Sequence, residues 1–378
     1  MIHHGNESYA VASSEAAAKA RVKLEDFIQK NVRSANAVIE RVESEVPTDK
    51  IITSDRLEIG AGSDGGYTLA TVGGEMRTRL HDHAFRQVAQ KTGVPSKYLT
   101  ELAEHGEWGK ELVLTNLNTM LRNDKPSRHL VRYVGSDDKQ EVRGFLSDRF
   151  RRLDSRPLLE SFVSACRSIG AVAIEGFSQD TRIKVRAVVP QVFEPLPNEP
   201  MVFGLEWGNS DFGHGGHYVS LWAMRMWCTN LAIGEECLRQ VHLGKRLDDQ
   251  IEYSRRTLEL DTRANASALG DTVKHAIGPK QISAYVSSIQ NAAEKGVQGT
   301  DVAKLLKGSL GKGEIEKVQA AFESPDEVNL PKGQSVYRLS NALSWIAQSE
   351  GLATDRKIEM QKVAGELLGA KAVTKRDV

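Results

Sequence analysis

The sequence predicts an α+β fold: a mostly antiparallel sheet covered by helices, with a long N-terminal helix and a helical C-terminal region. The chain opens on an amphipathic stretch, its middle holds short β-branched and aromatic runs, and helical periodicity returns toward the end. With 378 residues, the chain is long enough for two or three structural units. We expect an N-terminal helical arm (1–50), an α+β core (51–247) and a helical C-terminal region (248–378).

The N-terminal helix is predicted from Ser14 to about Ser44, where Ala, Glu, Lys and Arg surround apolar residues at helical spacing. Pro47 ends this pattern. Short β-prone pieces follow at 51–52, 57–59 and 67–72, separated by the turn sequences GAGSDGG and GGE. A helical layer should come next, from about Thr78 to Gly93, from Pro95 onward, and from Trp108 to about residue 122.

The sheet is predicted between Arg128 and about residue 228. RHLVRYV and KQEVRGFLS flank the turn GSDD and indicate a hairpin. A helix near 157–169 precedes four further strands: AVAIEGF, TRIKVRAVVP, PMVFGLEW and HYVSLWAMRMW. Helices are then expected near 248–263, 280–295, 301–306, 313–322, 335–348 and 354–368. We expect one sheet with helices on one side, and a tail that packs on it or on a second subunit.

Composition limits the classes of function. Fifty Lys and Arg balance fifty Asp and Glu, which excludes a globally basic coat, but residues 122–186 hold 14 basic and 9 acidic residues. The three cysteines, Cys166, Cys228 and Cys237, are too few and too scattered for a disulfide framework, which favours the cytoplasm. No apolar run approaches the roughly 18 residues that a membrane span needs, so no membrane partner is expected.

A cationic stripe is predicted on one strand. In TRIKVRAVV, alternation places Arg182, Lys184 and Arg186 on one face, where they could follow a phosphate backbone. The alternative is an outer strand face on which these cations pair with acids.

More arginines crowd the hairpin end and the following helix, beside Phe145 and Phe150. They could hold phosphates while the aromatics stack bases, or they could pair with Asp148 and Asp154 around core phenylalanines. The arginines of this cluster are Arg143, Arg149, Arg151, Arg152 and Arg156.

Arg225 lies inside the apolar run SLWAMRMW, where an unpaired cation would be costly. It is expected either to pair with a buried carboxylate such as Glu206 or to reach an anionic ligand.

The loop GNSDFGHGGHYV suggests two kinds of site. Asp211, His214 and His217 are metal-ligand types, but their spacing matches neither HxxxH nor CxxC, so they are weak candidates. The glycines suggest a phosphate-binding loop, yet no Walker or dinucleotide fingerprint is present and no cofactor is expected. A flexible connection between two strands is the simpler interpretation. His81 and His83, two residues apart at a helix start, are expected to cap or to lie on the surface.

Several segments resemble, in order, the signatures of the phage/plasmid-like protein family, a domain of unknown function. They are HAFRQVAQKTGVPSKYLTEL, EVRGFLSDRFRRLDSRPLLESF, EWGNSDFGHGGHYVSLWAMRMWCTN and RQVHLGKRL, which together span roughly residues 78–247. The resemblance implies a mobile-element origin and a role in DNA metabolism or host takeover. It supplies no reaction.

These observations predict a nucleic-acid-binding protein of a phage or plasmid that binds or anneals single-stranded DNA in recombination or replication, as a homo-oligomer. The predicted contacts are Arg143, Arg149, Arg151, Arg152, Arg182, Lys184, Arg186 and Arg225, with no catalytic residue. Two alternatives stay open: a metal-dependent hydrolase that uses Asp211, His214 and His217, and an anti-defence factor that binds a host protein through its helical tail.

Overall fold

The computed structural model describes residues 14–74, 77–136, 139–227, 230–240, 253–326 and 329–369, which leaves Cys228 outside the described residues. Its helices and two sheets confirm the predicted α+β class. The long first helix is also confirmed: α1 (Glu15–Ser44) begins after Ser14, whose hydroxyl accepts a hydrogen bond from the N–H of Ala17. This helix lies along strand β7 (Val172–Ser178), so it is a packing element of the fold.

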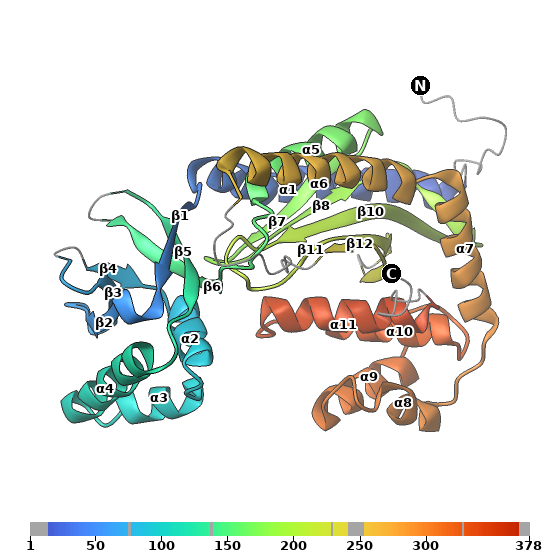
Figure 1. The fold of residues 1–378 in the computed structure, drawn as a ribbon. Helices are drawn as coiled ribbons and strands as arrows, with labels where there is room; N and C mark the ends of the chain where they lie inside the picture. Colours follow the sequence, from blue (N-terminus) through green and yellow to red (C-terminus); the bar gives the residue numbers. More distant parts are fainter. Residues whose placement is uncertain are drawn as a thin grey trace.

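The first sheet has the strand order β1-β5-β6-β4-β3-β2, and only its β4–β6 pair is parallel. One face packs on three helices around Phe145, Leu117 and Val88 (Figure 1). The elements are β1 (Thr48–Thr53), β2 (Leu57–Ala61), β3 (Tyr67–Thr71), β4 (Thr78–Leu80), β5 (Arg128–Val134), β6 (Glu141–Ser147), α2 (Asp82–Lys91), α3 (Ser96–Ala103) and α4 (Glu107–Asn123), with a 3₁₀ turn η1 (Ser54–Arg56).

The second sheet is antiparallel, with the order β12-β11-β10-β8-β7 and β9 beside β10. Its remaining strands are β8 (Ile183–Val188), β9 (Phe193–Leu196), β10 (Glu199–Asn209), β11 (His217–Arg225) and β12 (Asn230–Gln240). Both faces of β10 are buried, since Phe203 and Trp207 point into one core while Val202 and Glu206 point to the other side. A strand buried on both faces needs cover on both faces.

Helices supply that cover on the two sides of the second sheet. Figure 1 shows α1, α5 and α6 on one side and α10 and α11 on the other. The helices are α5 (Ser155–Ser168), α6 (Arg255–Ala276), α7 (Pro279–Glu294), α8 (Gly299–Leu306), α9 (Lys312–Glu323), α10 (Val336–Ile346) and α11 (Thr354–Leu367). The expectation of one sheet with helices on one side is therefore wrong. The helical tail packs on the sheet of its own chain, chiefly through α11 against β12.

Other differences from the sequence prediction are local. Thr78 opens strand β4, and the helix begins only at Asp82, after His81 caps it by accepting from the N–H of His83. Strands β9 and β12 were not predicted, and α6 continues to Ala276. No helix in the described part of the chain is both long and apolar enough to cross a membrane.

A buried ion-pair network joins the second sheet to α11. Arg186 donates to Glu206 at 2.7 Å, to Glu175 at 2.9 Å and to the side-chain oxygen of Gln361 at 2.9 Å. Tyr218 donates its hydroxyl to the second oxygen of Glu206 at 2.7 Å. Burial alone would raise the pKa of Glu206, but the charges of Arg186 and a neighbouring lysine outweigh it and lower the pKa, so this carboxylate is ionised at neutral pH.

We predict that Glu206→Gln lowers the free energy of unfolding by about 3 kcal/mol, because it leaves the charge of Arg186 buried with incomplete compensation. Urea unfolding at pH 7 measures this difference. The control is Glu366→Gln on exposed α11 surface, which should change stability by less than about 0.5 kcal/mol. Equal effects of the two variants would contradict a structural role for the network.

Candidate nucleic-acid interface

Three cations share one face of the sheet, as strand alternation predicts, but α11 covers them to different depths. They are Lys184 and Arg186 of β8 and Arg182, which directly precedes this strand. The side chain of Arg186 is 4% exposed, that of Lys184 is 14% exposed and that of Arg182 is 31% exposed. Only Lys184 and Arg182 therefore lie where a ligand could reach them. Arg186, predicted to contact nucleic acid, is enclosed by carboxylates of its own chain and belongs to the core.

The two accessible cations, Arg182 and Lys184, pair with one carboxylate in the first turn of α11. Arg182 binds Asp355 at 3.1 Å and Lys184 lies 3.8 Å from the other oxygen. Arg182 also donates from Nε to the backbone carbonyl of His214 at 2.5 Å, which ties the glycine-rich loop to the strand. Burial lowers the pKa of Lys184, although Glu206 and Asp355 oppose this effect.

A hollow of about 210 Å³ opens beside these residues, between the sheet and α11. We call it the basic groove. Four cationic side chains, two carboxylates, one tyrosine and the glycine-rich loop border it. They are Arg182, Lys184, Arg239, Lys362, Asp355, Glu359, Tyr218, His214, Gly215 and Gly216. The nitrogen of Lys362 stands 5.0 Å from the centre of the Tyr218 ring, a cation–π contact at the groove wall.

Two histidines lie next to the first sheet, and of these only His214 lines the groove. The rings of His83 and His214 stack with centroids 4.5 Å apart. His83 lies 3.0 Å from the Phe212 carbonyl, and Nδ1 of His214 lies 2.7 Å from the Thr181 hydroxyl. Burial, reinforced by Arg182, lowers the pKa of His214 to about 4, and burial also lowers the pKa of His83. Both rings are neutral at pH 7, so they add shape and hydrogen bonds without charge.

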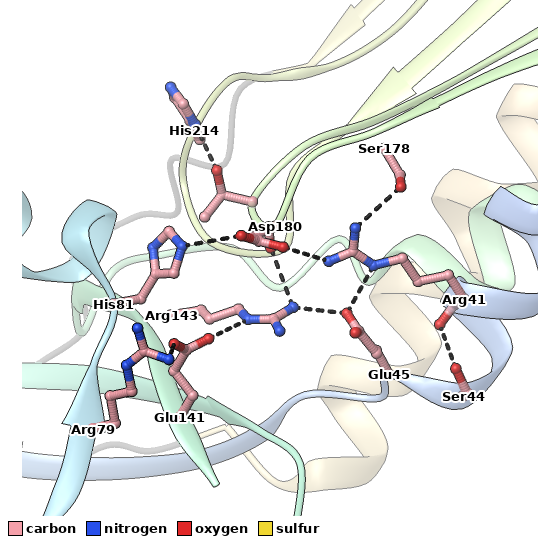
Figure 2. A network of polar contacts seen from close by, with 11 residues as sticks. Arg41, Ser44, Glu45, Arg79, His81, Glu141, Arg143, Ser178, Asp180 and His214 are labelled. Atoms are coloured by element: carbon pink, nitrogen blue, oxygen red, sulfur yellow. Dashed lines mark hydrogen bonds and ion pairs between the residues drawn. The ribbon is translucent and has the colours of Figure 1, made fainter. Parts of the chain in front are cut away.

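Arg143, another predicted contact, belongs to the junction of the two sheets (Figure 2). It donates to Glu45, the C-cap residue of α1, at 2.7 Å and to Glu141 of its own strand at 2.9 Å. Arg41 bridges Glu45 to Asp180 in the β7–β8 turn, and Asp180 also meets His81, 3.4 Å away. The network holds α1, both sheets and this turn together.

The remaining arginines of the cluster are mostly paired, though not with the predicted acids. Arg151 binds Asp261, Arg152 binds Asp49 and Arg156 binds Glu160. Arg149 is exposed, on the surface beside the hairpin. Phe145 and Phe150 are buried, so they pack in cores and offer no face to a base.

Arg225 is buried and engages Glu199 through two nitrogens and the carbonyl of Asn329 through a third. The expected ion pair therefore exists, but Glu206 was the wrong partner because its side chain serves Arg186. As a contact for nucleic acid, Arg225 is out of reach in this conformation.

Asp211, His214 and His217 do not converge. Asp211 accepts from the N–H and hydroxyl of Ser155, His214 faces the groove, and His217 lies fully buried against Trp207. No group of three or more His, Cys, Asp or Glu side chains that could hold a metal ion occurs within the described ranges. The hydrolase alternative thus has no ligand set in the part of the chain that the structure describes.

Sequence reasoning missed half of the groove. Asp355 and Lys362 lie on a helix more than 150 residues beyond β8, and Arg239 lies on the strand that was not predicted. The sequence places Tyr218 in a strand but does not indicate that it lines a binding site. The only available signal was strand alternation, which places Tyr218 on the same face as Glu206 through their adjacent strands.

No family model, no curated protein and no solved structure matched this chain in the comparisons.

Asp211 gives a pH-dependent prediction. Its burial and the nearby charge of Asp154 raise its pKa to about 6, against the opposing charge of Arg132. A raised carboxyl pKa means that the unfolded chain loses this proton at lower pH than the folded chain, so the residue lowers stability as pH rises through this window. Asp211→Asn should match the wild type near pH 4 and exceed it by about 3 kcal/mol at pH 7, since one pKa unit corresponds to about 1.4 kcal/mol.

Chemical denaturation of both proteins between pH 4 and pH 8 tests this. The difference in unfolding free energy should grow up to about pH 6 and then stay constant, with the pH 4 points as the internal control. If the Asn variant is the less stable protein at pH 7, the ionised carboxylate is needed beside Arg132 and the assignment fails.

Proposed function

We propose that this chain binds single-stranded DNA in the basic groove. One observation carries the proposal: four cationic side chains and an aromatic ring line a single hollow beside a glycine-rich loop. Grooves that combine cations for the backbone with aromatic faces for the bases are the usual way of binding single strands without sequence preference. Two of the cations, Arg182 and Lys184, belong to the stripe that the sequence predicts.

The charge of the groove favours an anion. Four cations face two carboxylates, Asp355 and Glu359, and the histidine of the groove, His214, is neutral at pH 7. A net positive wall attracts the phosphodiester backbone and releases its counterions, so binding should weaken as salt rises.

The size of the groove favours a single strand. A hollow of about 210 Å³ between a helix and a sheet has no room for a duplex, whose major groove alone is about 12 Å wide. An unpaired strand can follow such a groove with its phosphates along the cationic wall. The glycine-rich loop lets a backbone approach closely at Gly215, which lines the groove, has no neighbouring atoms where a Cβ would stand and adopts a positive φ angle that other residues rarely take.

We propose a biological role for this activity from the sequence alone. The resemblance to the phage/plasmid-like family supports a role in the recombination or replication of a mobile element, in the cytoplasm. A homo-oligomer that lines up several grooves would hold a longer strand, because linked sites gain from effective concentration.

We predict that Lys184→Gln, Arg239→Gln and Lys362→Gln together weaken binding of a fluorescent oligothymidylate by about 100-fold, because three charged contacts to phosphate are lost. The slope of log affinity against log salt should become shallower by about 2. Fluorescence anisotropy over a salt series measures both.

The matched control removes three exposed lysines that do not line the groove and changes net charge equally. Lys97, Lys304 and Lys317, each replaced by Gln, should alter affinity by less than about 3-fold. Absence of binding by the wild type at low salt would overturn the proposed function. Equal losses in both triple variants would show that binding does not occur in the groove.

Asp355 gives a prediction of opposite sign. Its carboxylate pairs with Arg182 and Lys184 and therefore competes with a phosphate of the strand for these cations. Asp355→Asn removes the competing charge and should tighten oligothymidylate binding about 3- to 10-fold. Glu366→Gln, on the same helix but outside the groove, removes the same charge and serves as control. Weaker binding by the Asn variant would mean that Asp355 positions the two cations for the strand and does not compete with it.

A further inference from the structure

A second cavity adjoins the basic groove at the first turn of α11. It has a volume of about 260 Å³ and lies between the end of β7, strand β8 and α11. We call it the Phe177 pocket. Its walls are Gly176, Phe177, Ser178, Gln179, Arg182, Lys184, Thr354, Asp355 and Ile358. Arg182, Lys184, Asp355 and Ile358 also border the basic groove, so the two hollows share a wall.

Phe177 is the aromatic residue of this pocket, and the buried guanidinium of Arg186 packs against its ring. The guanidinium carbon of Arg186 stands 5.0 Å from the ring centre, in cation–π geometry. Arg186 is itself held by Glu206 and Gln361, so the ring rests on an immobile cation. Phe177 is only half-buried, and a half-buried ring that lines a cavity presents apolar surface to whatever enters.

The other walls divide by chemistry. Ile358 is apolar, while Ser178, Gln179 and Thr354 carry hydrogen-bonding groups without charge. The charged residues lie where the pocket meets the groove. A planar apolar face, a neutral polar rim and cations at one side match a nucleotide: a base to stack, edges to hydrogen-bond and a phosphate to neutralise.

We infer that the Phe177 pocket takes one unstacked nucleobase of the bound strand. The base stacks on Phe177, and Arg182 and Lys184 hold the neighbouring phosphate at the shared wall. This inference rests on the proposed function, since the pocket is reached by a strand that follows the basic groove. It adds the place where one base is bound, a pocket outside the groove that holds the backbone.

The test compares two probes of equal length and charge, an oligothymidylate and the same deoxyribose-phosphate chain without bases. Wild type should bind the oligothymidylate about ten-fold more tightly, the usual scale of one aromatic–base stack. Phe177→Leu keeps an apolar side chain of similar volume against Arg186 but removes the ring. It should erase this preference and leave affinity for the abasic chain unchanged, whereas Phe177→Tyr should retain it.

The possible failures are distinguishable. If wild type binds neither probe at low salt, the proposed function itself is wrong. If wild type binds both probes equally, the groove holds a backbone and the base pocket is wrong. If Phe177→Leu weakens both probes by the same factor, Phe177 only supports the structure and the base pocket is again wrong. Urea unfolding of each variant, with the wild type alongside, shows that the comparison is between folded proteins.

Discussion

The arrangement of the groove depends on one buried ion pair, that between Arg186 and Glu206. Both side chains are almost completely removed from solvent, so each requires the other. Because Arg186 also binds Glu175 of β7 and Gln361 of α11, the pair helps to hold the last helix on the sheet, beside the packing of α11 on β12. The groove is the space that remains beside this attachment, and Phe177 of the adjoining pocket lies against the same guanidinium.

A second buried cation links the two sheets. Arg132 of β5 binds Asp49 at 2.8 Å and Asp154 at 2.6 Å, and it donates to the backbone carbonyl of Asp211 at 2.8 Å. The carbonyl belongs to the loop that carries His214 into the groove. The position of this loop therefore depends on both sheets, which explains why residues of α2 and of the β10–β11 loop meet in the stacked pair of His83 and His214.

Local patterns were sufficient to predict the helices and most strands. Ser14 and the apolar spacing after it place α1 correctly, and alternation places Arg182, Lys184 and Arg186 on one face. The partners of these cations could not be predicted, because Asp355 approaches β8 from about 170 residues away and nothing in either segment specifies their pairing. The same holds for Arg225, whose acid is Glu199 and not Glu206, although both carboxylates belong to β10, the strand that pairs with the strand of Arg225.

Strand alternation in and next to β8 gives one buried structural cation, Arg186, and two accessible cations, Arg182 and Lys184. Alternation gives the three side chains a common face, and the depth of cover by α11 then separates their roles. Where the helix closes over the strand, Arg186 must be neutralised by its own chain, since no water is left to solvate it. Where the helix begins, Asp355 is itself partly exposed and holds Arg182 and Lys184 only at its first turn. A partly solvated ion pair contributes little to stability, so a phosphate can replace this carboxylate at small cost to the fold. The groove can therefore bind an anion at its rim while the buried ion pairs of Arg186 stay intact.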